Sequence, residues 1–198
     1  MKKLMILAAA YGIFWFFFLR EAEVTLSPGV MAAAEPQQEI LDDTKSFDYK
    51  GYRITPLANF SIKAKILSKM TYRFGREADL SPVDLALGWG NMSDESVLET
   101  IRISQSNRFF HWRADELPIP RKEIETHASN MHLIPFDETT EAAIQRARKG
   151  EIISFSGYLV RVDGEDGWHW TSSLSRSDTG EGACELVWVK EFQVETPP

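Results

Sequence analysis

One cysteine and four histidines are the side chains of the 198-residue chain best suited to covalent chemistry. Cys184 is the only thiol, so the chain forms no internal disulfide and no cysteine-rich zinc site. A thiol becomes a nucleophile when an imidazole takes its proton, and His132 and His127 precede Cys184 as candidate bases. The alternative is a buried cysteine that packs as a small apolar residue. No other motif supports catalysis, so the sequence leans towards a protein that is not an enzyme.

The histidine spacing does not favour a metal ion. His127 and His132 are five residues apart, whereas side chains three or four apart share one face of a helix. Asp178 begins the tripeptide Asp-Thr-Gly, but it follows a polar segment and is better explained as a turn. We therefore expect no metal site and no cofactor.

Two segments alternate aromatic and basic side chains. They are Arg108–Arg113, with the sequence RFFHWR, and Trp168–Trp170, with the sequence WHW. On a strand, every second side chain faces the same side. Tryptophan rings with arginines and hydroxyls around one groove would suit a saccharide or an extended peptide. The same residues could instead form core. The candidate ligand-binding residues are Arg108, His111, Trp112, Arg113, Trp168, Trp170, Arg176 and Asp178.

The elements that must position these residues are mostly strands. Alternation of apolar and polar residues predicts strands at 47–54, ending before Pro56, and at 60–67, 99–104, 108–113, 151–162, 168–174 and 184–192. Capping signals predict short helices at 81–87, 120–129 and 139–149. This pattern predicts an α+β fold: one β-rich domain with a curved antiparallel sheet or small barrel and two or three short helices.

The N-terminus predicts a membrane segment. Lys2 and Lys3 precede sixteen uncharged residues, 4–19, which span about 24 Å as a helix. No small-residue cleavage site follows closely, so an uncleaved anchor is favoured over a cleaved signal peptide. We expect an anchor at 1–20, behind it a linker at 21–46 and a globular domain at 47–198. The basic start predicts a single pass through a bacterial inner membrane, with the domain in the periplasm.

The charge balance argues against nucleic acid as a partner. The chain has 22 basic and 29 acidic residues, a formal charge of −7. Without Lys2, Lys3 and Arg20, the outward part keeps 19 basic residues and carries −10. That field repels phosphate backbones.

About 70% of the chain resembles a family of uncharacterised bacterial proteins with an N-terminal membrane segment. The resemblance implies one intact domain and a bacterial source, and it brings no activity. The residues that carry it are 80–90 (LSPVDLALGWG), 103–106 (ISQS) with Trp112, 127–135 (HASNMHLIP), 157–160 (GYLV), 170–180 (WTSSLSRSDTG) and 182–185 (GACE).

Three functions remain open on the sequence. The leading hypothesis is a membrane-anchored binding or assembly module that engages an envelope protein or a cell-wall glycan. The second is a thiol-dependent hydrolase or transpeptidase acting on peptide or peptidoglycan through Cys184 and a histidine. The third is an accessory subunit of a membrane complex.

Overall fold

The chain folds around a ring of five strands. The computed structural model describes residues 23–175 and 183–195. Within them β3 (Tyr52–Thr71), β4 (Val83–Gly88), β7 (Ala128–Pro135), β10 (Glu185–Val194) and β8 (Ile152–Asp163) are paired in that order, and β8 pairs back to β3. The pair β7–β10 is parallel and the other four pairs are antiparallel. The predicted β-rich α+β fold is confirmed, with a mixed sheet in place of a purely antiparallel one.

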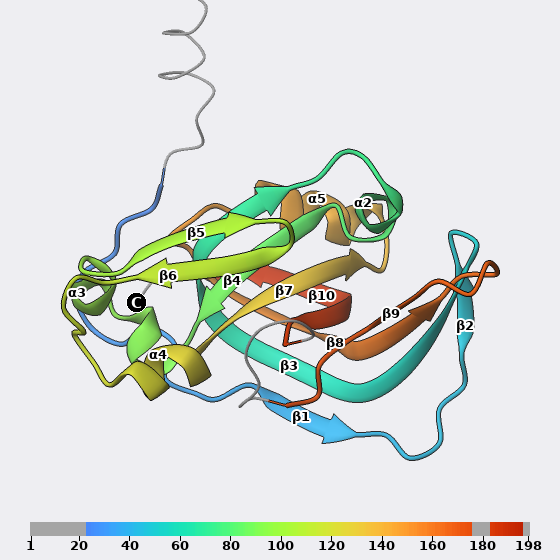
Figure 1. Ribbon diagram of the computed structural model, residues 1–198, viewed down its shortest axis with the longest axis horizontal. Helices are drawn as coiled ribbons and strands as arrows, with labels where there is room; N and C mark the ends of the chain where they lie inside the picture. Colours follow the sequence, from blue (N-terminus) through green and yellow to red (C-terminus); the bar gives the residue numbers. More distant parts are fainter. Residues whose placement is uncertain (1–22, 176–182, 196–198) are drawn as a thin grey trace, which may run out of the picture.

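Shorter elements surround the ring (Figure 1). β1 (Gln37–Ile40) and β2 (Phe47–Tyr49) pair with β3, and β9 (His169–Thr171) pairs with β8. β5 (Arg102–Ser106) and β6 (Phe109–Arg113) form a separate hairpin. In the described part of the chain the helices are α2 (Arg76–Leu80), α3 (Glu95–Leu98), α4 (Arg121–Thr126) and α5 (Glu138–Arg146), with a 3-10 turn, η1, at Gly90–Ser93.

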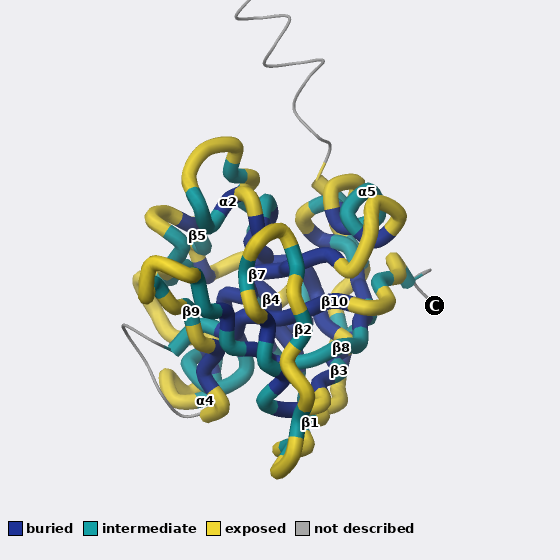
Figure 2. The backbone as a smooth tube through the Cα atoms, turned by 90° about the vertical axis from the view of Figure 1, so that its right-hand side faces the viewer, coloured by how far each residue is buried: buried dark blue, intermediate teal, exposed yellow. Residues whose placement is uncertain are grey.

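The two faces of the curved sheet bury different clusters, and Figure 2 shows the buried strands at the centre of the molecule. Leu85 of β4 and Leu133 of β7 belong to one cluster, which is shared with β3, β8 and β10. Ala86 and Ile134 face the opposite side, in two further clusters. Asp84 and His132 lie two residues from Ala86 and Ile134, so strand alternation places both on this second face.

Two local signals in the sequence are overridden by strand pairing. The segment predicted as a helix at 81–87 is instead strand β4, all of whose residues are buried between β3 and β7. A strand covered on both faces shows no alternation, and the Ser81-Pro82 pair imitates a helix start. Pro56 also does not end a strand, because β3 continues through a register shift between Pro56 and Ala58.

Part of the segment predicted as a linker lies along the domain. The Val24 amide donates to the Lys149 carbonyl at 2.9 Å, and the Ala32 amide donates to Ser93 Oγ at 2.9 Å. Gly150 has φ +89°, and a Cβ there would lie 1.7 Å from the Val24 carbonyl oxygen. The predicted anchor, 4–19, lies outside the described residues. Within 23–175 and 183–195, no helix is long and apolar enough to cross a membrane.

Gly157→Ala tests the closure of the ring. Gly157 lies opposite Val189 on β10, and a Cβ would come within 1.9 Å of the Trp188 carbonyl oxygen. Because backbone must move to relieve this overlap, we expect the free energy of unfolding to fall by about 2 kcal/mol or more. Urea denaturation measures the loss. The neighbouring control Ser156→Ala should change stability by less than about 0.5 kcal/mol, and equal midpoints for both variants would contradict the pairing.

Candidate functional site

A buried carboxylate lies at the centre of the second face of the sheet. Asp84 is fully buried in β4 and lies opposite His132 of β7 in the strand register. Its Oδ1 accepts a hydrogen bond from Arg108 Nη1 at 2.8 Å, and its Oδ2 lies 3.0 Å from His132 Nδ1. A buried carboxylate is costly unless such partners surround it. Asp84 therefore fixes the positions of two side chains from other elements.

Arg108 reaches Asp84 from the turn of the β5–β6 hairpin. Asn107 and Arg108 have φ of 49° and 67°, as a two-residue hairpin turn requires, and this region is unfavourable for arginine. The Arg108 amide donates to the Tyr72 hydroxyl at 3.2 Å. The guanidinium carbon lies 3.9 Å from the Tyr72 ring centroid and 5.3 Å from that of Trp170. These contacts hold a strained residue in place, a feature common at functional sites.

Tyr72 is the third group close to Asp84. Burial raises the pKa of the Tyr72 phenol above its usual value near 10, and the negative charge of Asp84 raises it further. The phenol is therefore neutral at pH 7 and keeps its proton as a hydrogen-bond donor.

Cys184 joins this network from the residue just before β10. β10 runs parallel to β7 with Leu186 opposite His132, so Cys184 lies level with Asn130. The Cys184 thiol donates to the Arg108 carbonyl at 3.8 Å, and Asn130 Nδ2 donates to the same oxygen at 2.8 Å. The turn that delivers Arg108 to Asp84 thus also contacts the cysteine.

A pocket of about 550 Å³ opens over this network. Its size is within the range of small-molecule sites. Strand β9 and the preceding turn contribute Trp168 and Trp170, whose ring centroids are 6.3 Å apart in an edge-to-face arrangement. The Trp170 ring also lies 4.8 Å from the ring of His132. The lining residues are Glu77, Asn107, Arg108, Phe109, His132, Trp168, His169, Trp170, Thr171 and Cys184.

The structure brings together part of the predicted ligand-binding set. Arg108, Trp168 and Trp170 line the pocket. The other predicted ligand-binding residues lie outside this pocket or outside the described residues.

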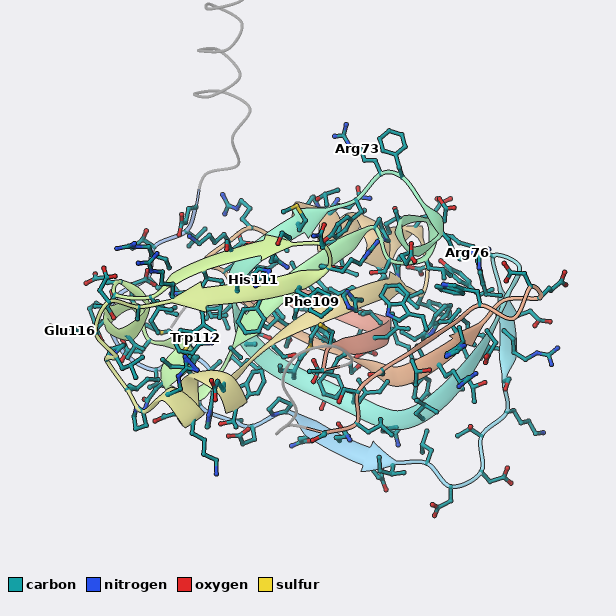
Figure 3. The ribbon with its side chains drawn as sticks, in the orientation of Figure 1. Arg73, Arg76, Phe109, His111, Trp112 and Glu116 are labelled. Carbon is teal, nitrogen blue, oxygen red and sulfur yellow. The ribbon has the colours of Figure 1, made fainter. Side chains whose placement is uncertain are left out.

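His111 and Trp112 lie on β6, outside the lining of this pocket, and Figure 3 shows Trp112 near α4. The exposed His111 has its Nε2 3.0 Å from Ser106 Oγ. Trp112 packs in the third apolar cluster, with the Arg121 guanidinium carbon 4.9 Å from its ring centroid. Arg113, also on β6, lies opposite Arg102. Arg176 and Asp178 lie outside the described residues.

The two candidate bases have different surroundings. His132 shares the pocket with Cys184. His127 Nε2 lies 2.9 Å from Glu35 Oε1, and its ring centroid is 6.3 Å from that of Trp89. Trp89 Nε1 donates to the other oxygen of Glu35 at 2.8 Å, so His127 helps to hold the N-terminal segment against the domain. Within the described ranges, no three His, Cys, Asp or Glu side chains are placed to hold a metal ion.

Sequence reasoning missed Asp84, Tyr72 and Asn130. The available signal was Asp84 itself, an acidic residue inside the apolar run 83–88, where a carboxylate is rarely buried without partners. The mistaken helix at 81–87 hid this signal, because a short amphipathic helix would expose an aspartate to solvent.

Comparisons with models of protein families, with curated proteins and with solved structures find no match to the chain. The resemblance to an uncharacterised bacterial family stays a prediction, and the chemistry of the site carries the functional argument.

A double-mutant cycle on Asp84 and Arg108 tests the buried pair. Arg108→Met leaves the Asp84 carboxylate without its strongest partner, so we expect a loss of about 3–5 kcal/mol in unfolding free energy. In the Asp84→Asn background, the same change should cost at least about 1.5 kcal/mol less. The control Arg102→Met breaks an exposed pair with Asp115 and should cost under about 1 kcal/mol. Additive losses would show that the pair is not coupled.

Proposed function

We propose that the protein is a membrane-anchored binding module of the bacterial envelope, and that the pocket above Asp84 binds fragments of peptidoglycan. The observation that carries this proposal is the pocket of about 550 Å³, whose lining combines Trp168 and Trp170 with hydrogen-bonding side chains. Few polar groups placed around aromatic surface are typical of sites that orient a ligand.

The lining suits a ligand that combines sugar and peptide. Tryptophan rings offer flat apolar surface to the C–H face of a sugar, and their N–H groups remain available as donors. Asn107 and Thr171 supply an amide and a hydroxyl, which can pair with sugar hydroxyls or with peptide groups. His169 is an exposed donor or acceptor at the same pocket.

The strand order supports the same ligand class by analogy. A closed ring of five strands, with α5 between β7 and β8, has the arrangement of an OB-fold barrel. Such barrels bind oligosaccharides and oligonucleotides on one sheet face and its flanking loops. The acidic balance of the outward part disfavours oligonucleotides, which leaves the saccharide.

The location of the module rests on residues 4–19. We propose that they anchor the chain in the inner membrane and that the acidic domain faces the periplasm, where peptidoglycan lies. The two lysines before the uncharged run support this orientation.

Binding to a muropeptide tests the proposed ligand. Isothermal titration of the full-length protein in mild detergent with a soluble disaccharide-peptide should give a saturable signal. Trp168→Ala should raise the dissociation constant about tenfold, because a buried aromatic contact contributes on the order of 1–2 kcal/mol to binding. The control Trp112→Ala, on β6 outside the pocket, should bind as the wild type does. Equal affinity of all three proteins would reject this pocket as the site.

Membrane fractionation tests the proposed anchor. The full-length protein should stay in the membrane pellet after washing at high salt and alkaline pH, because an apolar helix is held by hydrocarbon and not by charge. N-terminal sequencing should find residues 4–19 intact. A mature protein that is released by the wash, with its N-terminus beyond Leu19, would exclude the anchor.

A further inference from the structure

We propose that Cys184 is a nucleophile that accepts an acyl group from an amide or ester bound in the pocket, with His132 as its base. Asp84 positions the imidazole. The inference rests on the pocket of the proposed function and adds a reaction to it. Three independent parts of the chain, on β4, β7 and the start of β10, bring the three side chains to one face of the sheet.

The strand register places Asp84, His132 and Cys184 on one face of the sheet. Asp84 faces His132 across the β4–β7 pair, and His132 faces Leu186 across the β7–β10 pair. Cys184 is two residues before Leu186, so strand alternation places its side chain on the same face as His132. The thiol and the imidazole line the same cavity. Acid, imidazole and thiol thus follow one another across three neighbouring strands, the order that the proposed roles of positioning acid, base and nucleophile require.

The contact with Asp84 orients the His132 ring. Its Nδ1 lies 3.0 Å from Asp84 Oδ2 in ion-pair contact, and neither of these buried atoms makes a hydrogen bond with any described residue. With Nδ1 against Asp84, the other ring nitrogen is directed away from the carboxylate, and it is the one available to take a proton. Both side chains are at least 96% shielded from solvent. In such surroundings, a carboxylate strongly stabilises the imidazolium that forms when the thiol is deprotonated.

The surroundings of the thiol are consistent with a reacting group. Cys184 is only partly buried and borders a cavity large enough for a ligand, unlike a cysteine packed in the core. Its Sγ lies 3.8 Å from the Arg108 carbonyl oxygen. The charged and titratable side chains around the pocket and its network are Asp84 from β4, His132 from β7, Arg108 from the hairpin turn, Tyr72 after β3, His169 from β9 and Glu77 from α2.

The reaction balances without any cofactor. His132 takes the thiol proton, and the thiolate sulfur attacks the carbonyl carbon to form a C–S bond. The C–N or C–O bond of the substrate breaks, and the amine or alcohol leaves with the proton from the imidazolium. Water then attacks the thioester while His132 takes its proton, which yields a carboxylic acid and restores the thiol. The Arg108 guanidinium and the Asn107 side-chain amide line the pocket and supply N–H donors for the developing oxyanion.

Acylation by p-nitrophenyl acetate tests the nucleophile in the full-length protein. We expect a burst of p-nitrophenolate stoichiometric with the protein, and one acetyl group on the peptide that contains Cys184 by mass spectrometry. The wild-type burst rate should be half-maximal at a pH below about 8.5, the ordinary pKa of a thiol. A midpoint near 8.5, or acetyl groups spread over lysines, would overturn the proposal without any variant being needed.

Two histidine variants assign the base. His132→Gln should slow acylation of Cys184 at pH 7 at least about tenfold and move the midpoint of the pH profile upward. His111→Gln removes an exposed imidazole of β6 that lies outside the pocket lining, and it should leave both quantities unchanged. Thermal melts establish that each variant is folded. An unchanged profile in folded His132→Gln, or an equal loss in His111→Gln, would refute the assignment.

Cys184→Ala separates this inference from the proposed function. The variant should give no burst, while titration with the muropeptide should still show saturable binding. Muropeptide binding with no acylation of Cys184 would overturn the nucleophile and leave the binding module standing. Acylation that depends on His132, with no muropeptide binding, would instead keep the nucleophile and reject peptidoglycan as its substrate.

Discussion

The negative charge of Asp84 is the constraint on which the rest of the site depends. A carboxylate held in the middle of a fully buried strand destabilises the fold unless cations and donors reach it. Arg108 meets it from a hairpin turn, His132 from the next strand and Tyr72 from the end of β3. One buried charge thereby sets the position of three separate segments, and the pocket opens beside them. The backbone strain at Arg108 is offset by the same contacts.

The closed ring explains why this network is found on the second face of the sheet. One face is filled by an apolar cluster drawn from all five strands, which leaves no room for polar groups. The other face is covered in part by the β5–β6 hairpin and by β9 (Figure 1). The Arg108 guanidinium at the hairpin turn stacks on Trp170 of β9, and this contact lies beside Asp84. The parallel β7–β10 pair matters here, because it brings the start of β10 level with Asn130. Cys184 therefore lies on the same face of the sheet as Asp84 and His132.

The sequence predicted the class of fold and several pocket residues, since alternation and turn signals are local. It placed Arg108, Trp168 and Trp170 in one candidate set, and it named His132 and Cys184 together. It could not tell that Trp112 packs in the third apolar cluster and not in the pocket. Which side chains of β6 face the pocket depends on how the β5–β6 hairpin packs on the sheet, and a local pattern does not show this. It misread 81–87 because burial on both faces removes the pattern that identifies a strand. Pairings between distant segments, such as Asp84 with Arg108, leave no local trace at all.

The hydrogen bond from the Val24 amide to the Lys149 carbonyl holds the N-terminal segment against the domain, and this limits how far the domain can extend from the proposed anchor. If residues 4–19 occupy the bilayer as proposed, the chain between Arg20 and Val24 reaches at most roughly 14 Å when fully extended. A domain held on so short a stalk would stay close to the lipid headgroups and would have little freedom to tilt or to swing outward.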